Sequence, residues 1–217
     1  MKNLLRHLIF ASLVAVPLFY AYTIFGGLPE VVPTHWNIDG KADGWGSRES
    51  IFLGPGIMAA VSLVTYLLLS NLHRFDPKRV GEENVPVFKN FALVNTALLS
   101  ALSLVIVRMA SGRGEEFSIL TVISLFFVVF GLFMPHLKQN YFAGFRLPWT
   151  LESEANWEAT HKIAGKFWVI GGVIQAVASL LLESRSAFIV FGVVTAAVTI
   201  IPAIYSYRMF RKQHLSD

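Results

Sequence analysis

Apolar residues along this chain gather into long runs that are separated by short polar stretches. Each run is about 20 residues long, which is the length an α-helix needs to cross the hydrocarbon core of a bilayer. The polar stretches leave no room for a separate soluble domain. The pattern predicts an all-α integral membrane protein with six transmembrane helices, at 8–25, 51–72, 87–107, 117–135, 163–182 and 187–207.

Composition supports a membrane protein rather than a soluble one. Hydrophobic residues make up 54% of the chain and charged residues only 15%, too few to cover the surface of a soluble domain of 217 residues. The chain has no cysteine, which excludes disulfides and thiolate metal sites. The absence of cysteine does not indicate whether the protein faces an oxidising or a reducing compartment.

The basic residues are distributed unevenly between alternate polar stretches. Of the 18 Lys and Arg, 13 lie in the amino-terminal head, the 73–89 and 136–166 loops and the tail. Because cytoplasmic loops carry the excess of positive charge, we expect both termini in the cytoplasm and the 28–50 loop outside. This orientation explains the high pI without nucleic-acid binding. The expected location is the plasma membrane, as a multi-pass protein.

The stretch from Asn140 to Lys166 carries more than a simple connection between two spans needs. A helix-start pattern at Thr150 is followed by Glu152 and Glu154, whose charges suit the first turn of a helix. Aromatic and apolar residues then recur at helical spacing on one face. These residues predict an interfacial helix before the fifth span: Trp157, His161, Ala164 and Trp168.

The 28–50 loop combines two prolines with Asp-Gly turn dipeptides, so it is expected to be structured but not helical. His35, Asp39 and Asp43 recur every four residues, and a folded loop would bring them together. With Trp36 they are the candidate extracytoplasmic ligand or ion face. The alternatives are a divalent cation, which needs further ligands, and a loop closed by hydrogen bonds of its Asp-Gly turns. No other cofactor is expected.

The spans divide into two predicted units. Residues 1–72 form a two-helix unit with the structured loop 28–50, and residues 87–217 form a four-helix unit with the loop 136–166. Glycines within the spans are expected to allow close helix packing rather than to break helices. They are Gly131, Gly171, Gly172 and Gly192.

Two stretches resemble a known family. The run Asn140-Tyr-x-x-Gly144-x-Arg146-x-Pro148-Trp149-Thr150-Leu151, followed by Trp157-x-x-Thr160-His161 and Gly165-Lys166, is similar to the signature of the SdpI family. Residues from Leu28-Pro29 through Pro33-Thr34-His35-Trp36-Asn37 to Gly46-Ser47 resemble the small uncharacterised domain that usually precedes it. Together the two matches account for about the full length.

The resemblance implies a membrane immunity protein against a secreted antimicrobial toxin. It also implies a receptor that holds a cytoplasmic autorepressor at the membrane while toxin is present. A further hypothesis is that the outer loop meets the toxin and the bundle shifts between two packings. The oligomeric state is left open.

The polar and aromatic residues of the inner loop have two interpretations. One is a cytoplasmic face for a partner or for signalling, and the other is a lock between the surface helix and the bundle through cation–π contact and interfacial anchoring. Arg146, Trp149 and His161 are the leading candidates. The full predicted face is Asn140, Gly144, Arg146, Trp149, Thr150, Trp157 and His161.

Two other function classes remain as alternatives. A small-molecule or ion transporter usually carries charged groups within its spans, and here the intramembrane polar residues are few, chiefly Asn71, Asn95 and Gln175. A membrane enzyme would use Glu152, Glu154 and His161 for acid–base chemistry. Helix-start electrostatics already explain the two glutamates, so the expectation is that the protein is not an enzyme and has no catalytic residues.

Overall fold

The computed structural model describes residues 2–76, 85–113 and 118–214. Parts of the predicted 73–86 and 108–116 loops, the end of the tail and Phe117, the predicted start of the fourth span, lie outside the described residues.

Helices dominate the described chain, and six of them are long and apolar enough to cross a membrane. This confirms the predicted fold class. The elements are α1 (Lys2–Phe25), β1 (Val31–Trp36), β2 (Ala42–Ser47), the 3₁₀ helix η1 (Arg48–Phe52), α2 (Leu53–Ser70), α3 (Leu72–Phe75), α4 (Val85–Ala110), α5 (Ser118–Phe133), the 3₁₀ helix η3 (Met134–His136), α6 (Pro148–Glu152), α7 (Glu154–Leu181) and α8 (Ser184–His214).

The fifth span differs most from its predicted bounds. The helix begins at Glu154, because the Ser153 side chain caps it by accepting a hydrogen bond from the Asn156 backbone N–H at 3.2 Å. Thr150 lies instead in the five-residue helix α6, which has a proline in its first turn. The interfacial helix is therefore only α6. The residues from 154 onward continue into the span without a break.

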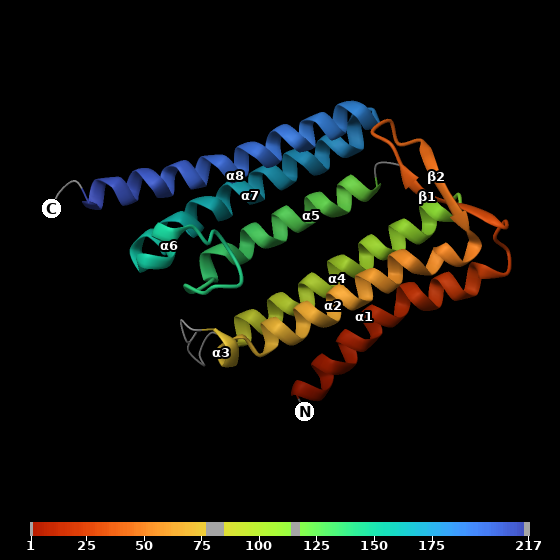
Figure 1. The fold of residues 1–217 in the computed structure, drawn as a ribbon, viewed down its shortest axis with the longest axis horizontal. Helices are drawn as coiled ribbons and strands as arrows, with labels where there is room; N and C mark the ends of the chain where they lie inside the picture. The colour runs from red at the N-terminus through yellow and green to blue at the C-terminus, as the bar shows by residue number, and fades with distance from the viewer. Residues whose placement is uncertain (1, 77–84, 114–117, 215–217) are drawn as a thin grey trace.

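The six long helices form two groups of three (Figure 1). Helix α4 packs mainly against α1 and α2, while α7 packs between α5 and α8. Both chain termini, α3 and α6 lie at one end of the bundle, called here the terminal end. The strands β1 and β2 lie at the opposite, hairpin end. Helix α4 packs with α1 and α2, although it follows them after the 73–86 loop. The division into units 1–72 and 87–217 stays a prediction.

Prolines within α1 and α8 create contacts between helices. Pro17 has no N–H, so the carbonyl of Leu13 loses its helical partner; the Ser100 hydroxyl donates to that carbonyl at 2.7 Å. The proline of α8 frees the carbonyl of Val198 in the same way, and Trp168 Nε1–H donates to it at 3.1 Å. Each missing helical bond is thus replaced by a bond to a neighbouring helix, as membrane helices require.

Glycines let α5 and α7 approach closely. A Cβ added to Gly131 would lie 2.7 Å from the carbonyl oxygen of Gly165, and one on Gly172 would lie 2.8 Å from that of Ser124. Gly171 meets α8 at Val198. The predicted packing role is confirmed for these glycines. It is wrong for Gly192, where an added Cβ would meet nothing within 4 Å.

The loop between the first two spans is an antiparallel β-hairpin, which the turn signals alone did not specify. Asn37 closes its turn by accepting hydrogen bonds from the backbone N–H groups of Asp39 and Lys41. Trp36 packs on a cluster that includes Ala21 and Val107, from α1 and α4. The hairpin is therefore attached to the first helix group.

Candidate functional site

Asn140 organises the loop that leads from η3 to α6. Its side chain is completely buried. The Oδ1 atom accepts hydrogen bonds from the backbone N–H groups of Phe142 and Ala143 at 2.8 and 2.7 Å. The Nδ2 group donates to the carbonyls of Lys138 and Ala143 at 2.8 and 3.1 Å. One amide side chain thus satisfies backbone N–H groups and backbone carbonyls of the same tight turn.

His161 holds the far side of the same loop. Its Nδ1–H donates to the Trp157 carbonyl at 2.8 Å, and its Nε2 accepts from the Phe145 N–H at 2.9 Å. These two partners define a neutral imidazole, since a second proton on Nε2 would face an N–H donor. Gly144 has φ +106°, and a Cβ there would overlap the His161 ring. Glycine is required at this position for both reasons.

Thr150 connects the loop to α6. The buried hydroxyl of Thr150 donates to the Phe145 carbonyl at 2.6 Å and accepts from the Leu147 N–H at 2.9 Å. Gln139 Nε2 donates to the Thr150 carbonyl at 2.7 Å. These bonds fold residues 139–150 back on themselves, so the loop is a defined structure and not a free connection.

Trp157 anchors the loop to the bundle. It is completely buried, its Nε1–H donates to the Leu137 carbonyl at 2.7 Å, and its ring stacks on His161 with centroids 4.0 Å apart. It also belongs to an apolar cluster that includes Leu72 and Phe88 of the other helix group. Trp157 therefore joins the two groups at the terminal end.

A buried polar network that the sequence analysis did not identify fastens α6 and α7 to α8. Trp149 Nε1–H donates to the Ser206 hydroxyl, which donates to Asn156 Oδ1, each at 2.7 Å. Thr160 donates to the same oxygen at 3.0 Å, and Asn156 Nδ2 donates to the Ser206 carbonyl. The available sequence signal was an asparagine beside Trp157 with a threonine, Thr160, one helical turn later. Ser206, within an apolar span, offered none.

Arg146 is the exposed charged residue of the predicted inner face, of which Gly144 is also exposed. Its guanidinium donates to the Tyr141 carbonyl at 3.0 Å and otherwise faces away from the protein. The expected cation–π lock involving Arg146 is wrong, because the one cation–π pair found among the described residues joins Arg48 to Phe25. Asn140, Thr150, Trp157 and His161 are buried beneath this surface and shape it from within.

The three predicted acid–base residues, Glu152, Glu154 and His161, do not come together in the structure. Glu152 and Glu154 are exposed, whereas His161 is buried with both ring nitrogens bonded to backbone groups. Among the described residues both ring nitrogens are bonded to backbone groups, and neither is bonded to a carboxylate.

At the hairpin end, the predicted trio of His35, Asp39 and Asp43 separates into two ion pairs. His35 Nδ1 lies 2.6 Å from Asp43 Oδ1, across the exposed face of the hairpin. Asp39 turns toward Arg185 at the start of α8, whose Nε and Nη2 donate to the two carboxylate oxygens at 2.8 and 3.2 Å. The hydrogen bonds from Arg185 lower the pKa of the Asp39 carboxyl below its ordinary value.

The separation of Asp39 from His35 and Asp43 argues against a divalent cation bound by all three side chains. Within the described part of the chain, no three His, Asp or Glu side chains lie together in a metal-binding arrangement. Trp36, the fourth predicted residue of this face, is half-buried against α1 and α4. Trp45 is instead the exposed aromatic side chain of the hairpin, at 61%.

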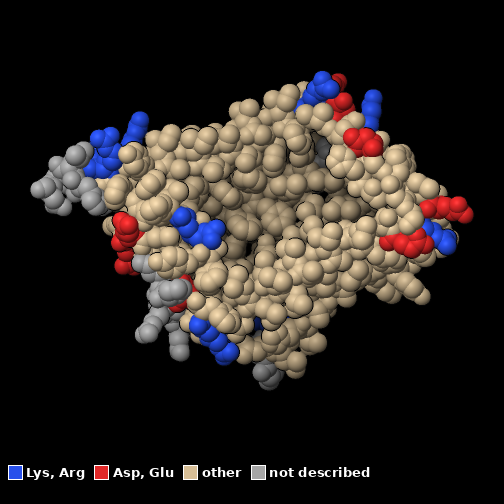
Figure 2. Space-filling model, in the orientation of Figure 1, with Lys and Arg blue, Asp and Glu red and all other residues tan. Residues whose placement is uncertain are grey.

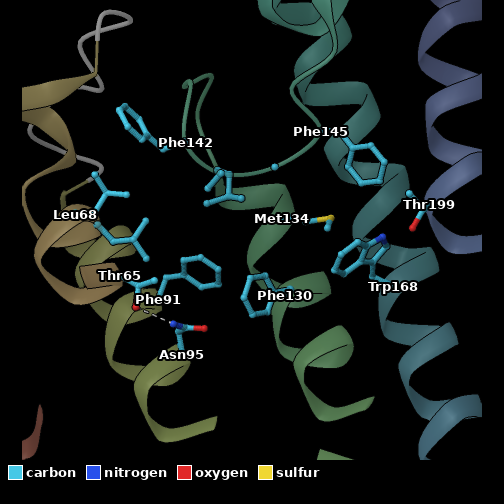
Figure 3. Close-up of a pocket in the computed structure, with 14 residues that line it drawn as sticks. Thr65, Leu68, Phe91, Asn95, Phe130, Met134, Phe142, Phe145, Trp168 and Thr199 are labelled. Atoms are coloured by element: carbon cyan, nitrogen blue, oxygen red, sulfur yellow. Dashed lines mark hydrogen bonds between the residues drawn. The ribbon is translucent and has the colours of Figure 1, made fainter. Parts of the chain in front are cut away.

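A cavity of about 470 Å³ lies between the two helix groups. Figure 2 shows the molecule hollowed at its centre, with acidic and basic residues gathered at the two ends of this face. Phe91 and Asn95 line the cavity from α4, and Phe130 and Trp168 line it from α5 and α7 (Figure 3). Asn95 Nδ2 donates to Thr65 at 3.2 Å.

The loop held by Asn140 and His161 forms one wall of this cavity. Phe142 and Phe145 lie at the end of the cavity nearest the loop (Figure 3), and Ala143 and Gly144 also line the cavity. The hydrogen bond from Phe145 to His161 therefore lies beside the cavity.

Two family models match separate parts of the chain. The SdpI/YfhL protein family matches residues 136–206, which contain the loop, α6, α7 and most of α8. The domain of unknown function DUF1648 matches residues 12–59, which contain the hairpin and parts of α1 and α2.

Two relatives illustrate the similarity. "Immunity protein SdpI" of Bacillus subtilis (strain 168) is 25% identical over 209 residues, covering 95% of this chain and 97% of that protein. An uncharacterized protein of Archaeoglobus fulgidus is 32% identical over 93 residues, covering 40% of this chain and 46% of that protein. No solved structure matches this chain. The chain is therefore a multi-pass membrane protein whose residues 136–206 are similar to the SdpI/YfhL protein family and whose residues 12–59 are similar to DUF1648.

Proposed function

We propose that this protein is a membrane immunity protein that meets a secreted antimicrobial toxin at its hairpin end and reports this event at its terminal end. Similarity over 95% of the chain to a protein named as an immunity protein supports the toxin. The single structural observation that carries the mechanism is the Asp39–Arg185 pair, which joins the hairpin of the first helix group to α8 of the second.

In this proposal the hairpin faces outward and both termini lie in the cytoplasm, as the excess of basic residues at the terminal end favours. The exposed Trp45 and the His35–Asp43 pair offer a surface for the toxin. A toxin bound there would compete for or reinforce the Asp39–Arg185 pair, and so change how the hairpin holds the two groups together.

The cavity supplies space for such a change. Its walls come from both groups, so a shift between them alters its width without disrupting the packing inside either group. Phe142 and Phe145 would move with it, and the loop surface that carries Arg146 would change its shape. That exposed surface is the proposed site of capture of a cytoplasmic autorepressor.

A growth-protection assay tests the hairpin half of the proposal. The protein is produced in a host sensitive to the sporulation-delay toxin, with Asp39→Arg, Arg185→Asp and the combined charge-swapped variant at matched membrane levels. We expect protection by the wild type, loss in each single variant and recovery when the swap restores the ion pair. Lys41→Gln, an exposed neighbour outside the pair, is the control and should protect.

Absence of protection by wild-type protein at normal membrane levels would refute the toxin assignment. Protection that survives in both single variants would refute the role of the ion pair while leaving immunity in place.

The cytoplasmic half is tested by capture of the candidate repressor from the same cells. Arg146→Ala should leave membrane levels unchanged, because Arg146 makes one hydrogen bond to backbone and is exposed. Capture should be lost, whereas Lys162→Ala, an exposed cation on the first turns of α7, should retain it. Equal capture by both variants would contradict the role of Arg146.

A further inference from the structure

A second, smaller cavity lies at the terminal end, among α1, α2 and α4, away from the signature loop. Its volume is about 170 Å³. It is lined by polar and basic side chains with one leucine, including Arg6 and His7 of α1, Ser70 of α2 and Lys89 of α4. Neither the immunity function nor the signature loop uses these residues.

The electrostatics of this cavity favour an anion. Arg6 and Lys89 are half-buried, and none of the described residues that line the cavity is acidic. The ion pairs of the described residues include neither of these two cations. One hydrogen bond, from Arg6 Nη2 to Asn90 Oδ1 at 3.2 Å, orients the guanidinium, and its other N–H groups make no hydrogen bond to the described residues. Two partly desolvated cations attract an anion more strongly than exposed ones do.

Ser70 adds a hydrogen-bond donor that has no partner among the described residues. Its hydroxyl oxygen is buried and has no hydrogen-bond partner among the described residues, although it lines the cavity. Buried hydroxyl groups are normally satisfied, so this one points to a missing ligand oxygen. His7 is already engaged, because its Nδ1 shares a hydrogen bond with the Tyr66 hydroxyl at 3.1 Å.

We propose that this cavity binds the phosphate of an anionic phospholipid headgroup. A phosphate offers several oxygens, which match a guanidinium, an ammonium and a hydroxyl from three helices. The volume is below the roughly 300 Å³ of typical small-molecule sites, and it suits a headgroup rather than a whole organic ligand. Basic pockets between membrane helices are a known setting for lipid headgroups.

The surroundings favour a lipid over free phosphate. Leu4, Leu5 and Leu8 expose more than half of their surface on α1 beside the cavity, and Leu67, which lines it, is 52% exposed. Acyl chains can lie along these leucines while the phosphate occupies the cavity. The bound headgroup would link α1 to α2 and α4, since Arg6, Ser70 and Lys89 come from these three helices.

The test compares thermal unfolding of the purified full-length protein in detergent with added phosphatidylglycerol, phosphatidylcholine or inorganic phosphate. Phosphatidylglycerol should raise the unfolding midpoint by about 3 °C or more at saturation, since a ligand of the native state stabilises it. Phosphatidylcholine and inorganic phosphate should produce less than a third of this shift.

Variants locate the effect. Arg6→Gln and Lys89→Gln should each reduce the phosphatidylglycerol shift at least twofold, and the double variant should remove it. Lys162→Gln removes the same charge at the terminal end outside the cavity, and it should keep the full shift. Unfolding in phosphatidylcholine checks that each variant is folded, and native mass spectrometry counts retained phosphatidylglycerol directly.

Three results would overturn the proposal. Equal shifts from both lipids would show general solvation by lipid, and an equal shift from inorganic phosphate would show a free-anion site. An equal loss in Lys162→Gln would show that net charge alone is responsible.

Discussion

At the terminal end, Asn140, Asn156 and Thr160 are completely buried, whereas at the hairpin end the side chains of His35, Asp43 and Arg185 are 71, 43 and 64% exposed. Both ends are rich in polar residues and both contain family-like motifs. The buried groups can only hold the structure, because nothing outside the protein can reach them. The exposed groups remain accessible to a ligand.

A motif that resembles a family signature does not by itself show which of its residues contact a partner. In the signature loop, burial assigns most polar residues to shape and leaves Arg146 at the surface. At the hairpin end, His35, Asp39, Asp43 and Arg185 instead form exposed charged pairs, which contribute little to stability and are easily exchanged for contacts with a ligand.

The largest loss of stability is expected from Asn140→Leu. The change removes four hydrogen bonds, and each buried backbone group left without a partner costs about 1–3 kcal/mol, so the free energy of unfolding should fall by about 3 kcal/mol or more. Chemical denaturation in detergent measures it.

Asn37→Leu is the matched change at the hairpin end. Asn37 also closes a turn with its side-chain oxygen, but it accepts two bonds and is only half-buried, so the loss should be about 1 kcal/mol. Equal losses at Asn37 and Asn140 would contradict the contrast between the two ends.

The second largest loss of stability is expected from Gly144→Ala. The new Cβ meets the His161 ring, and the backbone keeps a φ of +106°, so destabilisation should be about 1–3 kcal/mol. The NMR signal of the His161 ring should also move, because its bond from Phe145 N–H is disturbed.

Gly112→Ala serves as the control for Gly144→Ala. Gly112 has a φ of +72° but nothing within 4 Å of an added Cβ, so it carries backbone strain alone. A larger effect at Gly112 than at Gly144 would show that the contact with His161 is unimportant.

Trp149→Phe should have a moderate effect. It removes the hydrogen bond to Ser206 but keeps ring packing against Tyr207 and Phe210, and the expected loss is about 1 kcal/mol. Trp45→Phe, at an exposed tryptophan of the hairpin, should leave the unfolding midpoint unchanged. If Trp149→Phe were equally silent, the network from α6 to α8 would not contribute to stability.

The smallest effect on stability is expected from Asp39→Asn, because the Asp39–Arg185 pair is exposed. The pair lowers the pKa of Asp39 in the folded protein, so its contribution is present above the ordinary value of 3.8 and is lost only as the pH falls below that value. Between about pH 5 and 8 the contact should therefore not change.

Spin labels can follow this contact cleanly, because the chain has no cysteine of its own. Cysteines placed at Lys41 and Glu183 report the distance between the hairpin and the α7–α8 connection. The distance should hold from pH 8 to 5 and increase in Asp39→Asn. A transition near neutral pH would show that another group controls the contact.

Much of the architecture followed from the pattern of apolar residues. Six spans were predicted and found, since a bilayer requires a continuous apolar helix for each crossing. The fifth span was misplaced at its start because Trp157 and His161 were interpreted as surface positions. In the structure they are packed beneath the loop, and their helix continues directly into the span.

The motifs also identified the loop around Asn140 and the hairpin around Asp39 as the unusual segments, which the structure bears out as folded elements. The pattern did not separate buried from exposed polar residues. Asparagine and threonine occur readily in both environments, and only their neighbours decide which environment they occupy.

The sequence by itself determined the number of spans, the placement of both termini at one end and the position of the two polar elements, because these depend on local composition and on length. Tertiary structure alone decided that Asp39 meets Arg185, 146 residues away, and that Asn156 meets Ser206, 50 residues away. Such pairs depend on which helices pack together and at what rotation, and a hydrophobic pattern facing lipid on most sides does not encode either.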